Sequence, residues 1–168
     1  MSALGELAAP TTRDGDLVDT AEAVVALAMN TVECDFAGLT VFAGKNRLVT
    51  LAPSDPIVEQ ADQLQYDLQE GPCVMAAWEE DTFVSNDLSC DARWPNWGPK
   101  ATALGMSSLL ATRLANGDRT IGALNLYSTQ RREFTTEDRD FARVFASHAG
   151  SIILTARELQ NLRVALDA

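Results

Sequence analysis

Two apolar runs, over residues 106–114 and 120–128, are separated by Asn116-Gly117-Asp118, and this pattern constrains the fold more than any other. A short Asn-Gly or Gly-Asp connection between apolar runs is the strongest local signal for a β-hairpin. A second pair of apolar runs, at 36–42 and 47–52, flanks a Gly-Lys-Asn turn in the same way. Strands that arrive as hairpins pair antiparallel, so the sequence predicts an antiparallel sheet rather than alternating βαβ units.

Helical patterns precede, separate and follow these hairpins. Apolar residues recur at helical spacing over about 17–33. Thr135 and Asp138 form a capping-box pattern that opens a long final helix. Further helices are expected at about 56–64, 73–80 and 98–104, and a short strand at 82–85. The order helix, hairpin, helices, strand, helix, hairpin, helix predicts the α+β class.

Charge and length limit the kinds of partner that this chain can have. Its 168 residues suggest one domain, and the formal net charge is -11. An acidic surface repels phosphate backbones and anionic lipids, so direct nucleic-acid binding is not expected. No run of about 18 apolar residues and no signal-peptide pattern occurs, so no membrane span is expected. Three cysteines, an odd number, indicate reduced thiols and a cytoplasmic location.

Five short stretches resemble a known family. They are Gln69-Glu70-Gly71-Pro72-Cys73, Asn86-Asp87-Leu88, Asp91-Ala92-Arg93-Trp94-Pro95, Ala103-Leu104-Gly105-Met106 and Ile121-Gly122-Ala123-Leu124-Asn125-Leu126-Tyr127. Together they resemble the GAF domain, most closely that of bacterial GAF–ANTAR regulators, over about residues 16–166.

The resemblance implies both a fold and a role. The expected fold is a central antiparallel sheet with the terminal helices on one face and a ligand pocket on the other. The expected role is a non-catalytic sensory domain that needs no cofactor, binds an unidentified small ligand and dimerises. In GAF–ANTAR proteins the last helix continues into an ANTAR domain, an RNA-binding module of transcription antitermination, which is absent from this sequence. The implied division is a flexible tail (1–15), a GAF domain (16–158) and the start of a helical connector (159–168).

The last helix carries an apolar stripe with alternating spacings of four and three residues. Such a 3.5-residue repeat is typical of a coiled coil and predicts a homodimer. The alternative is a single helix packed on its own sheet, which would bury Phe141, Val144 and Phe145. The stripe begins at Phe141 and Phe145, and the residues expected at the dimer interface are His148, Ile152, Thr155, Leu159, Leu162 and Leu166.

The loop around Trp94 and Trp97 is the candidate ligand site. Tryptophan in a polar loop suits the lid of a pocket, and Arg93 could pair with a carboxylate or phosphate of the ligand. Cys73 and Asp87 complete the candidate set. The alternative is structural: Arg93 pairs with Asp87 or Asp91, and the two tryptophans cap the core. Trp78 is expected in the core.

Other chemistry has weaker support. Cys73 lies near an expected helix N-terminus, which would lower the pKa of its thiol. Cys73 and Cys90 could then form a redox pair, as in GAF-fold enzymes that reduce free methionine sulfoxide, although both can equally be ordinary small residues. A purely structural dimerisation module is a further alternative. His148 is expected to be packed or at an interface rather than a metal ligand, so no metal site is predicted.

Overall fold

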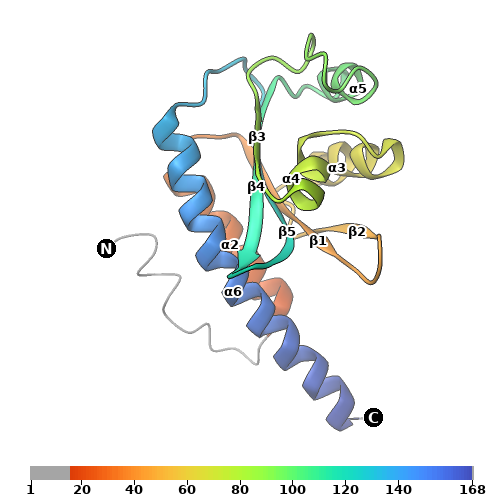
Figure 1. The fold of residues 1–168 in the computed structure, drawn as a ribbon, viewed down its shortest axis with the longest axis vertical. Helices are drawn as coiled ribbons and strands as arrows, with labels where there is room; N and C mark the ends of the chain where they lie inside the picture. The colour runs from red at the N-terminus through yellow and green to blue at the C-terminus, as the bar shows by residue number, and fades with distance from the viewer. Residues whose placement is uncertain (1–15, 168) are drawn as a thin grey trace.

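A computed structural model describes residues 16–167, so the predicted flexible tail (1–15) and Ala168 lie outside the described residues. The chain forms a five-stranded antiparallel sheet with strand order β2-β1-β5-β4-β3, flanked by helices on both faces (Figure 1). This confirms the α+β prediction. The elements are α2 (Leu17–Thr31), β1 (Phe36–Phe42), β2 (Leu48–Leu51), α3 (Pro56–Leu68), α4 (Pro72–Glu79), β3 (Thr82–Ser85), α5 (Trp97–Ala103), β4 (Ser108–Asn116), β5 (Arg119–Ser128) and α6 (Thr136–Asp167).

Both predicted hairpins form. β4 and β5 pair from Ser108↔Ser128 to Asn116↔Arg119, with a register shift between Leu114 and Ala115. β1 pairs with β2 and also with β5, so the inner strands of the sheet are β1, β5 and β4. Helices lie on both faces of the sheet (Figure 1), which explains why β5 is a nearly continuous buried run rather than alternating polar and apolar residues.

The two faces of the sheet carry separate hydrophobic clusters. α2 and α6 cover one face, and α3, α4 and α5 lie on the other (Figure 1). Successive residues of β4 divide between them: Leu110 packs in the cluster under α2 and α6, whereas Leu109 and Ala111 pack on the opposite side. This alternation is the period-2 geometry of a strand. Two buried tryptophans, Trp94 and Trp97, belong to the cluster on the α3–α5 side.

Local capping fixes where several helices begin and end. The carboxylate of Asp55 accepts a hydrogen bond from the backbone N–H of Ile57 and starts α3. The predicted capping box at Thr135 and Asp138 forms with two reciprocal bonds of 3.0 Å. α3 continues to Leu68, four residues beyond its expected end, because the chain turns only at Gln69, which adopts a left-handed conformation.

The final helix, α6, extends beyond the sheet on which it packs. Its buried residues lie between Ala142 and Ala156, and every residue from 158 to 167 is exposed. In Figure 1 this part of α6 projects beyond the sheet and beyond α2. None of the helices in residues 16–167 is long and apolar enough to cross a lipid bilayer.

Candidate functional site

A carboxylate lies buried between the sheet and α3. Asp62, on α3, has no exposed surface. It accepts a hydrogen bond from the hydroxyl of Thr50 on β2 at 2.8 Å and another from the hydroxyl of Tyr127 on β5. No lysine or arginine forms an ion pair with this carboxylate within residues 16–167. Hydroxyl groups rather than a cation therefore stabilise the charge.

A chain of hydroxyls extends this contact across the sheet. The hydroxyl of Tyr66 lies 2.7 Å from Thr40 Oγ1 and 2.9 Å from Thr50 Oγ1. The side-chain amide of Asn125 donates to Thr40 Oγ1 at 2.8 Å. Since Thr50 donates to Asp62, the whole chain can direct its donors toward the carboxylate. The side-chain carbonyl oxygen of Asn125 is buried and has no hydrogen-bond partner among residues 16–167.

The Gly71-Pro72-Cys73 turn closes the other end of this cluster, which we call the buried polar network (Thr40, Thr50, Asp62, Gln65, Tyr66, Cys73, Asn125 and Tyr127). Gln65 accepts from the backbone N–H of Cys73 at 2.9 Å and donates to the hydroxyl of Tyr127 at 3.0 Å. Gly71 has a φ of 137°, and a Cβ there would lie 2.1 Å from Gln65 Oε1. Glycine is thus required for the turn to close over Gln65.

Burial dominates the electrostatics of the network. It raises the pKa of Asp62 to about 7, although the hydrogen bonds from Tyr127 and Thr50 oppose the shift. Burial also raises the pKa of Tyr66 and of Tyr127, and the charge of Asp62 adds to both shifts. The network therefore contains one group, Asp62, that can change its charge near neutral pH.

The expectation for Cys73 is wrong in its electrostatic part. The residue does lie in the first turn of a helix, α4. However, burial and then the charge of Asp62 raise the pKa of its thiol well above the ordinary value. Its backbone N–H is already bonded to Gln65. A fully buried thiol gains little from the partial charge of a short helix, so Cys73 is a neutral thiol here.

A pocket of about 420 Å³ opens beside the network. Tyr66 belongs to both, since it lines the pocket and bonds to the strands through its hydroxyl. Trp78 forms another part of the wall and packs edge-on against Phe42, with ring centroids 4.9 Å apart. Trp78 is 49% exposed, so its expected place in the core is wrong. The pocket is lined by Asn46, Leu48, Tyr66, Gln69, Val74 and Trp78.

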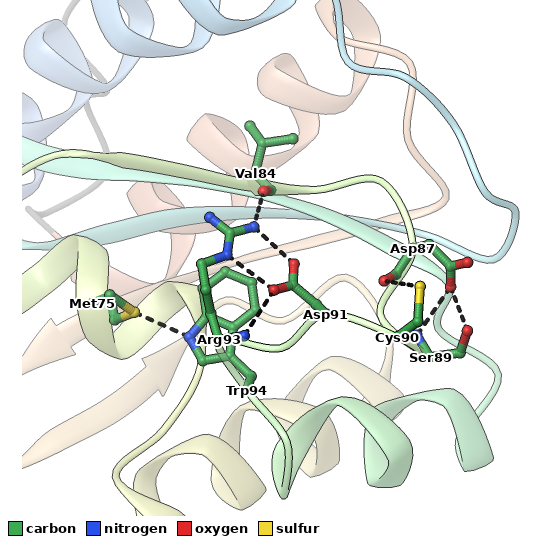
Figure 2. A network of polar contacts seen from close by, with 8 residues as sticks. All are labelled: Met75, Val84, Asp87, Ser89, Cys90, Asp91, Arg93 and Trp94. Atoms are coloured by element: carbon green, nitrogen blue, oxygen red, sulfur yellow. Dashed lines mark hydrogen bonds and ion pairs between the residues drawn. The ribbon is translucent and has the colours of Figure 1, made fainter.

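The Asp-Arg-Trp-Pro loop is held together by its own side chains (Figure 2). Arg93 donates to both carboxylate oxygens of Asp91, at 2.9 and 2.7 Å, and to the carbonyl of Val84 at 2.6 Å. The guanidinium also stacks over the ring of Trp94 at 4.2 Å. The structural alternative, in which Arg93 pairs with Asp91, describes this arrangement. A ligand that bound the Nε–Nη2 edge of Arg93 would have to displace Asp91.

Both tryptophans of the loop are buried. Trp94 is 1% exposed and its indole N–H points at the sulfur of Met75 (Figure 2). Trp97 has no exposed surface and donates its indole N–H to the carbonyl of Ala61 at 2.9 Å. The carboxylate of Glu70 accepts the backbone N–H of Trp97 and fixes the start of α5. The tryptophans thus complete the core, and contact between them and a ligand stays a prediction.

Asp87 and Cys90 lie together at the edge of the same loop, whereas Cys73 belongs to α4. Asp87 accepts from the backbone and hydroxyl of Ser89 and pairs with Arg131 at 3.1 Å. Cys90 is exposed, whereas Cys73 is buried, and neither forms a disulfide. The structure therefore brings Asp87 and Cys90 together and joins Cys73 to the buried polar network instead.

The predicted dimer residues line the outer surface of α6. His148 and Thr155 are exposed and Ile152 is half-buried, so His148 is not packed within its own chain. Leu159, Leu162 and Leu166 are 45%, 56% and 75% exposed. Within its own chain α6 buries Phe145, but Val144, expected to pack with it, is 48% exposed. Within residues 16–167, no three His, Cys, Asp or Glu side chains are placed to share a metal ion.

Comparisons with known proteins identify relatives of this fold. A family model described as GAF domain matches residues 14–154. No curated protein sequence gives a significant match. Among solved structures, the GAF domain of an Acinetobacter phosphoenolpyruvate-protein phosphotransferase superposes with a TM-score of 0.72 at 15% identity, covering 96% of this chain and 99% of that one.

Two further structures are similar at the same level. The type II free methionine-R-sulfoxide reductase of Thermoplasma acidophilum has a TM-score of 0.66 at 17% identity, covering 82% of this chain and 92% of that one. The chromophore-binding domain of a bacteriophytochrome from R. palustris has a TM-score of 0.64 at 13% identity, covering 94% and 60%. At these identities the likeness concerns the fold alone.

Proposed function

This chain belongs to the GAF domain family, and we propose that it is a non-catalytic cytoplasmic sensory module that binds a small ligand in the pocket between Tyr66 and Trp78. The observation that carries the proposal is the double role of Tyr66. Its side chain lines the pocket, while its hydroxyl bonds to Thr40 of β1 and Thr50 of β2. A ligand that contacts Tyr66 can therefore act on the sheet.

Transmission to an output follows from the same contacts. A ligand changes an equilibrium between two arrangements only through its different affinity for each of them. A ligand that bonds to the hydroxyl of Tyr66 would compete with Thr40 and Thr50, and thus would favour an arrangement in which α3 sits differently on the sheet. α6 packs on β4 in the same sheet and projects beyond it, so it is the element that would carry the change outward.

The proposed output is a dimer of helices that leads to a further domain. The exposed stripe on α6 is the surface that a second copy would cover, which gives a homodimer. On the resemblance to GAF–ANTAR regulators, we propose that the module controls transcription antitermination through an ANTAR domain that binds RNA. A net charge of -11 supports placing RNA binding in that partner domain rather than in this one.

Cysteine placement favours a sensor over the thiol-dependent reductase, the competing enzymatic function. A reductase needs an accessible nucleophilic thiolate. Cys73 has no exposed surface and a raised pKa, and Cys90 lies exposed at the edge of another loop. The second competing function is a structural dimerisation module whose interior is filled by its own side chains, with no void beneath the tryptophan loop and no bound ligand.

The experiment that tests the proposal has two steps. Native and denatured masses of the purified chain show whether it is a dimer and whether it carries a removable ligand. A metabolite library is then screened by thermal shift on the wild type, on Trp78→Ala in the pocket wall, and on Val164→Ala as a control outside the pocket and the stripe on α6. We expect a hit that stabilises the wild type and Val164→Ala but not Trp78→Ala. Hits that stabilise all three equally, or no hits and no extra mass, would favour the structural module.

A further inference from the structure

A second hollow lies on the other side of the β1–β2 hairpin, close to the point where α6 leaves the sheet. It has a volume of about 620 Å³, within the usual range for small-molecule sites. Its walls come from the start of α2, the strands β1, β2 and β5, and α6. Leu17, Val49, Leu51 and Ile121 supply apolar surface. We call it the arginine groove, because Arg119 and Arg157 also line it.

The two arginines of the groove lack acidic partners. Arg157 donates one N–H to the backbone carbonyl of Phe42 at 2.9 Å, which fixes its guanidinium against β1. Within residues 16–167 the ion pairs are formed by other arginines, and neither Arg119 nor Arg157 lies within 4.0 Å of a carboxylate oxygen. Burial, and next the positive charge of Arg119, lower the pKa of Arg157, and the charge of Glu158 opposes the shift. Two cations thus face one partly apolar hollow that no carboxylate lines.

The side chains of Arg93, Arg131 and Arg132 each form an ion pair with a carboxylate. The arginine groove differs, because its lining includes two arginines and no Asp or Glu. Arg119 is exposed, but the half-buried guanidinium of Arg157 is partly desolvated and has a second cation beside it. An anion with an apolar body would pair with the two cations and cover the apolar walls. A guanidinium also matches the planar geometry of a carboxylate, with which it forms two parallel hydrogen bonds.

We propose that the arginine groove binds a small free carboxylate with a hydrocarbon body. Its head group lies between Arg119 and Arg157, within reach of the amide of Asn161, and its hydrocarbon body covers Leu17, Val49, Leu51 and Ile121. The site is separate from the pocket at Tyr66 and does not depend on the function proposed for that pocket.

The location gives such a ligand a physical effect. Arg157 lies on α6 directly before the exposed end of the helix, and Asn161 lies one turn further, within that end. Arg119 begins β5 and Phe42 ends β1. A carboxylate held between these elements ties α6 to the sheet at the place where it departs. Binding would then stabilise one direction of the projecting helix, through contacts that exist in only one arrangement.

Decanoate is a suitable probe, used below its micelle concentration on the full chain. Calorimetry compares it with 1-decanol, which has the body without the charge, and with acetate, which has the charge without the body. Arg119→Gln and Arg157→Gln remove the two cations, and Arg139→Gln removes one charge from an exposed part of α6 as a matched control. Arg119→Gln leaves the Arg157–Phe42 bond intact and so keeps the test valid if Arg157→Gln is unstable.

The expected result is saturable binding of one decanoate to the wild type and to Arg139→Gln with the same affinity. Each groove variant should lower that affinity at least about tenfold, the usual effect of losing a charge-assisted hydrogen bond. Decanol and acetate should bind much more weakly. The proposal is overturned if decanol binds as tightly as decanoate or if the arginine variants bind normally. It also fails if anionic lipid vesicles bind to the protein and free decanoate does not. A rise in the affinity for decanoate on dilution of the protein would overturn it as well, because a second copy of the chain would then be the occupant of the groove.

Discussion

The hydroxyl of Tyr127 donates a hydrogen bond to the carboxylate of Asp62 at a place where neither side chain reaches solvent. The donor comes from β5 and the acceptor from α3, so this contact joins the sheet to the helix layer that carries the pocket. Since hydroxyls rather than cations stabilise the charge, the carboxylate is costly to ionise. The stability of the domain should therefore report on its protonation.

The first prediction concerns the pH dependence of that stability. The pKa of Asp62 is raised from 3.8 to about 7 in the folded chain. A raised folded pKa means that this group favours folding most below about pH 4, and that this contribution is lost as pH rises to about 7. The loss is on the order of 4 kcal/mol. Asp62→Asn should remove it, so the variant should gain stability relative to the wild type between pH 4 and 7.

Urea unfolding at several pH values measures this difference, with Asp67→Asn as the control. Asp67 lies on the same helix but is exposed, so its variant should follow the wild type at every pH. A difference between wild type and Asp62→Asn that stays constant from pH 4 to 8 would contradict the assignment.

A second prediction tests how α6 packs. Gly150 lies so close to β4 that a Cβ at this position would be 1.8 Å from the carbonyl oxygen of Ala115. Backbone cannot move aside as a side-chain tip can, so Gly150→Ala should lower the free energy of unfolding by about 3 kcal/mol or more. Ser147→Ala, on an exposed position of the same helix, should change it by no more than about 0.5 kcal/mol. Equal stability of the two variants would show that α6 packs less closely than described.

A third prediction concerns the start of α5. Glu70 accepts the backbone N–H groups of Asn96 and Trp97, both at 2.8 Å, and its carboxylate replaces a helix cap. Glu70→Ala should lower the free energy of unfolding by about 1–2 kcal/mol, as loss of a cap does. Glu79→Ala, at the exposed end of α4, is the matched control. Trp97 should become more solvent-exposed in the first variant only, which would shift the tryptophan emission spectrum to longer wavelengths. An unchanged spectrum would count against the capping role.

Local chemistry explains which parts of the fold could be predicted. The hairpins and the capping box were predicted correctly because Asn116-Gly117 and Thr135–Asp138 act through neighbouring residues. The end of α3 was not predicted correctly, because the residue that adopts the left-handed conformation there is Gln69 and not a glycine. Tertiary packing decided that boundary.

The buried polar network was missed for a related reason. Asp62 and Gln65 follow Val58 and Ala61 on one face of α3, so helical periodicity alone places them inward. Because both residues are polar, their burial could not be predicted from the apolar pattern of the helix. Their partners are far away in sequence: Gln65 meets Tyr127 only because α3 packs on β5, a relationship that no local pattern encodes. Burial likewise reversed the expected pKa shift of Cys73.

A fourth prediction separates a sensor from a thiol enzyme. Cys90 is exposed, Cys34 is half-buried with a pKa raised by burial to about 12, and Cys73 is buried. Ellman's reagent at pH 8 should therefore modify one thiol rapidly, and Cys90→Ser should remove that phase. Cys73 should react only after unfolding. A second rapid thiol that disappears in Cys73→Ser, or a peroxide-induced Cys73–Cys90 disulfide seen by mass spectrometry, would support the reductase instead.

The last prediction tests the stripe on α6. Leu162 is 56% exposed and lies on the stripe, whereas Val164 is 65% exposed and lies on another side of the helix. Light scattering after size exclusion should show a dimer for the wild type and for Val164→Glu. Leu162→Glu should give a monomer, because a charge on the seam would be buried without a partner. Since both variants add one negative charge to an exposed apolar position, a general charge effect would dissociate them equally. Dimers of both variants, or a monomeric wild type, would show that the stripe is not the interface.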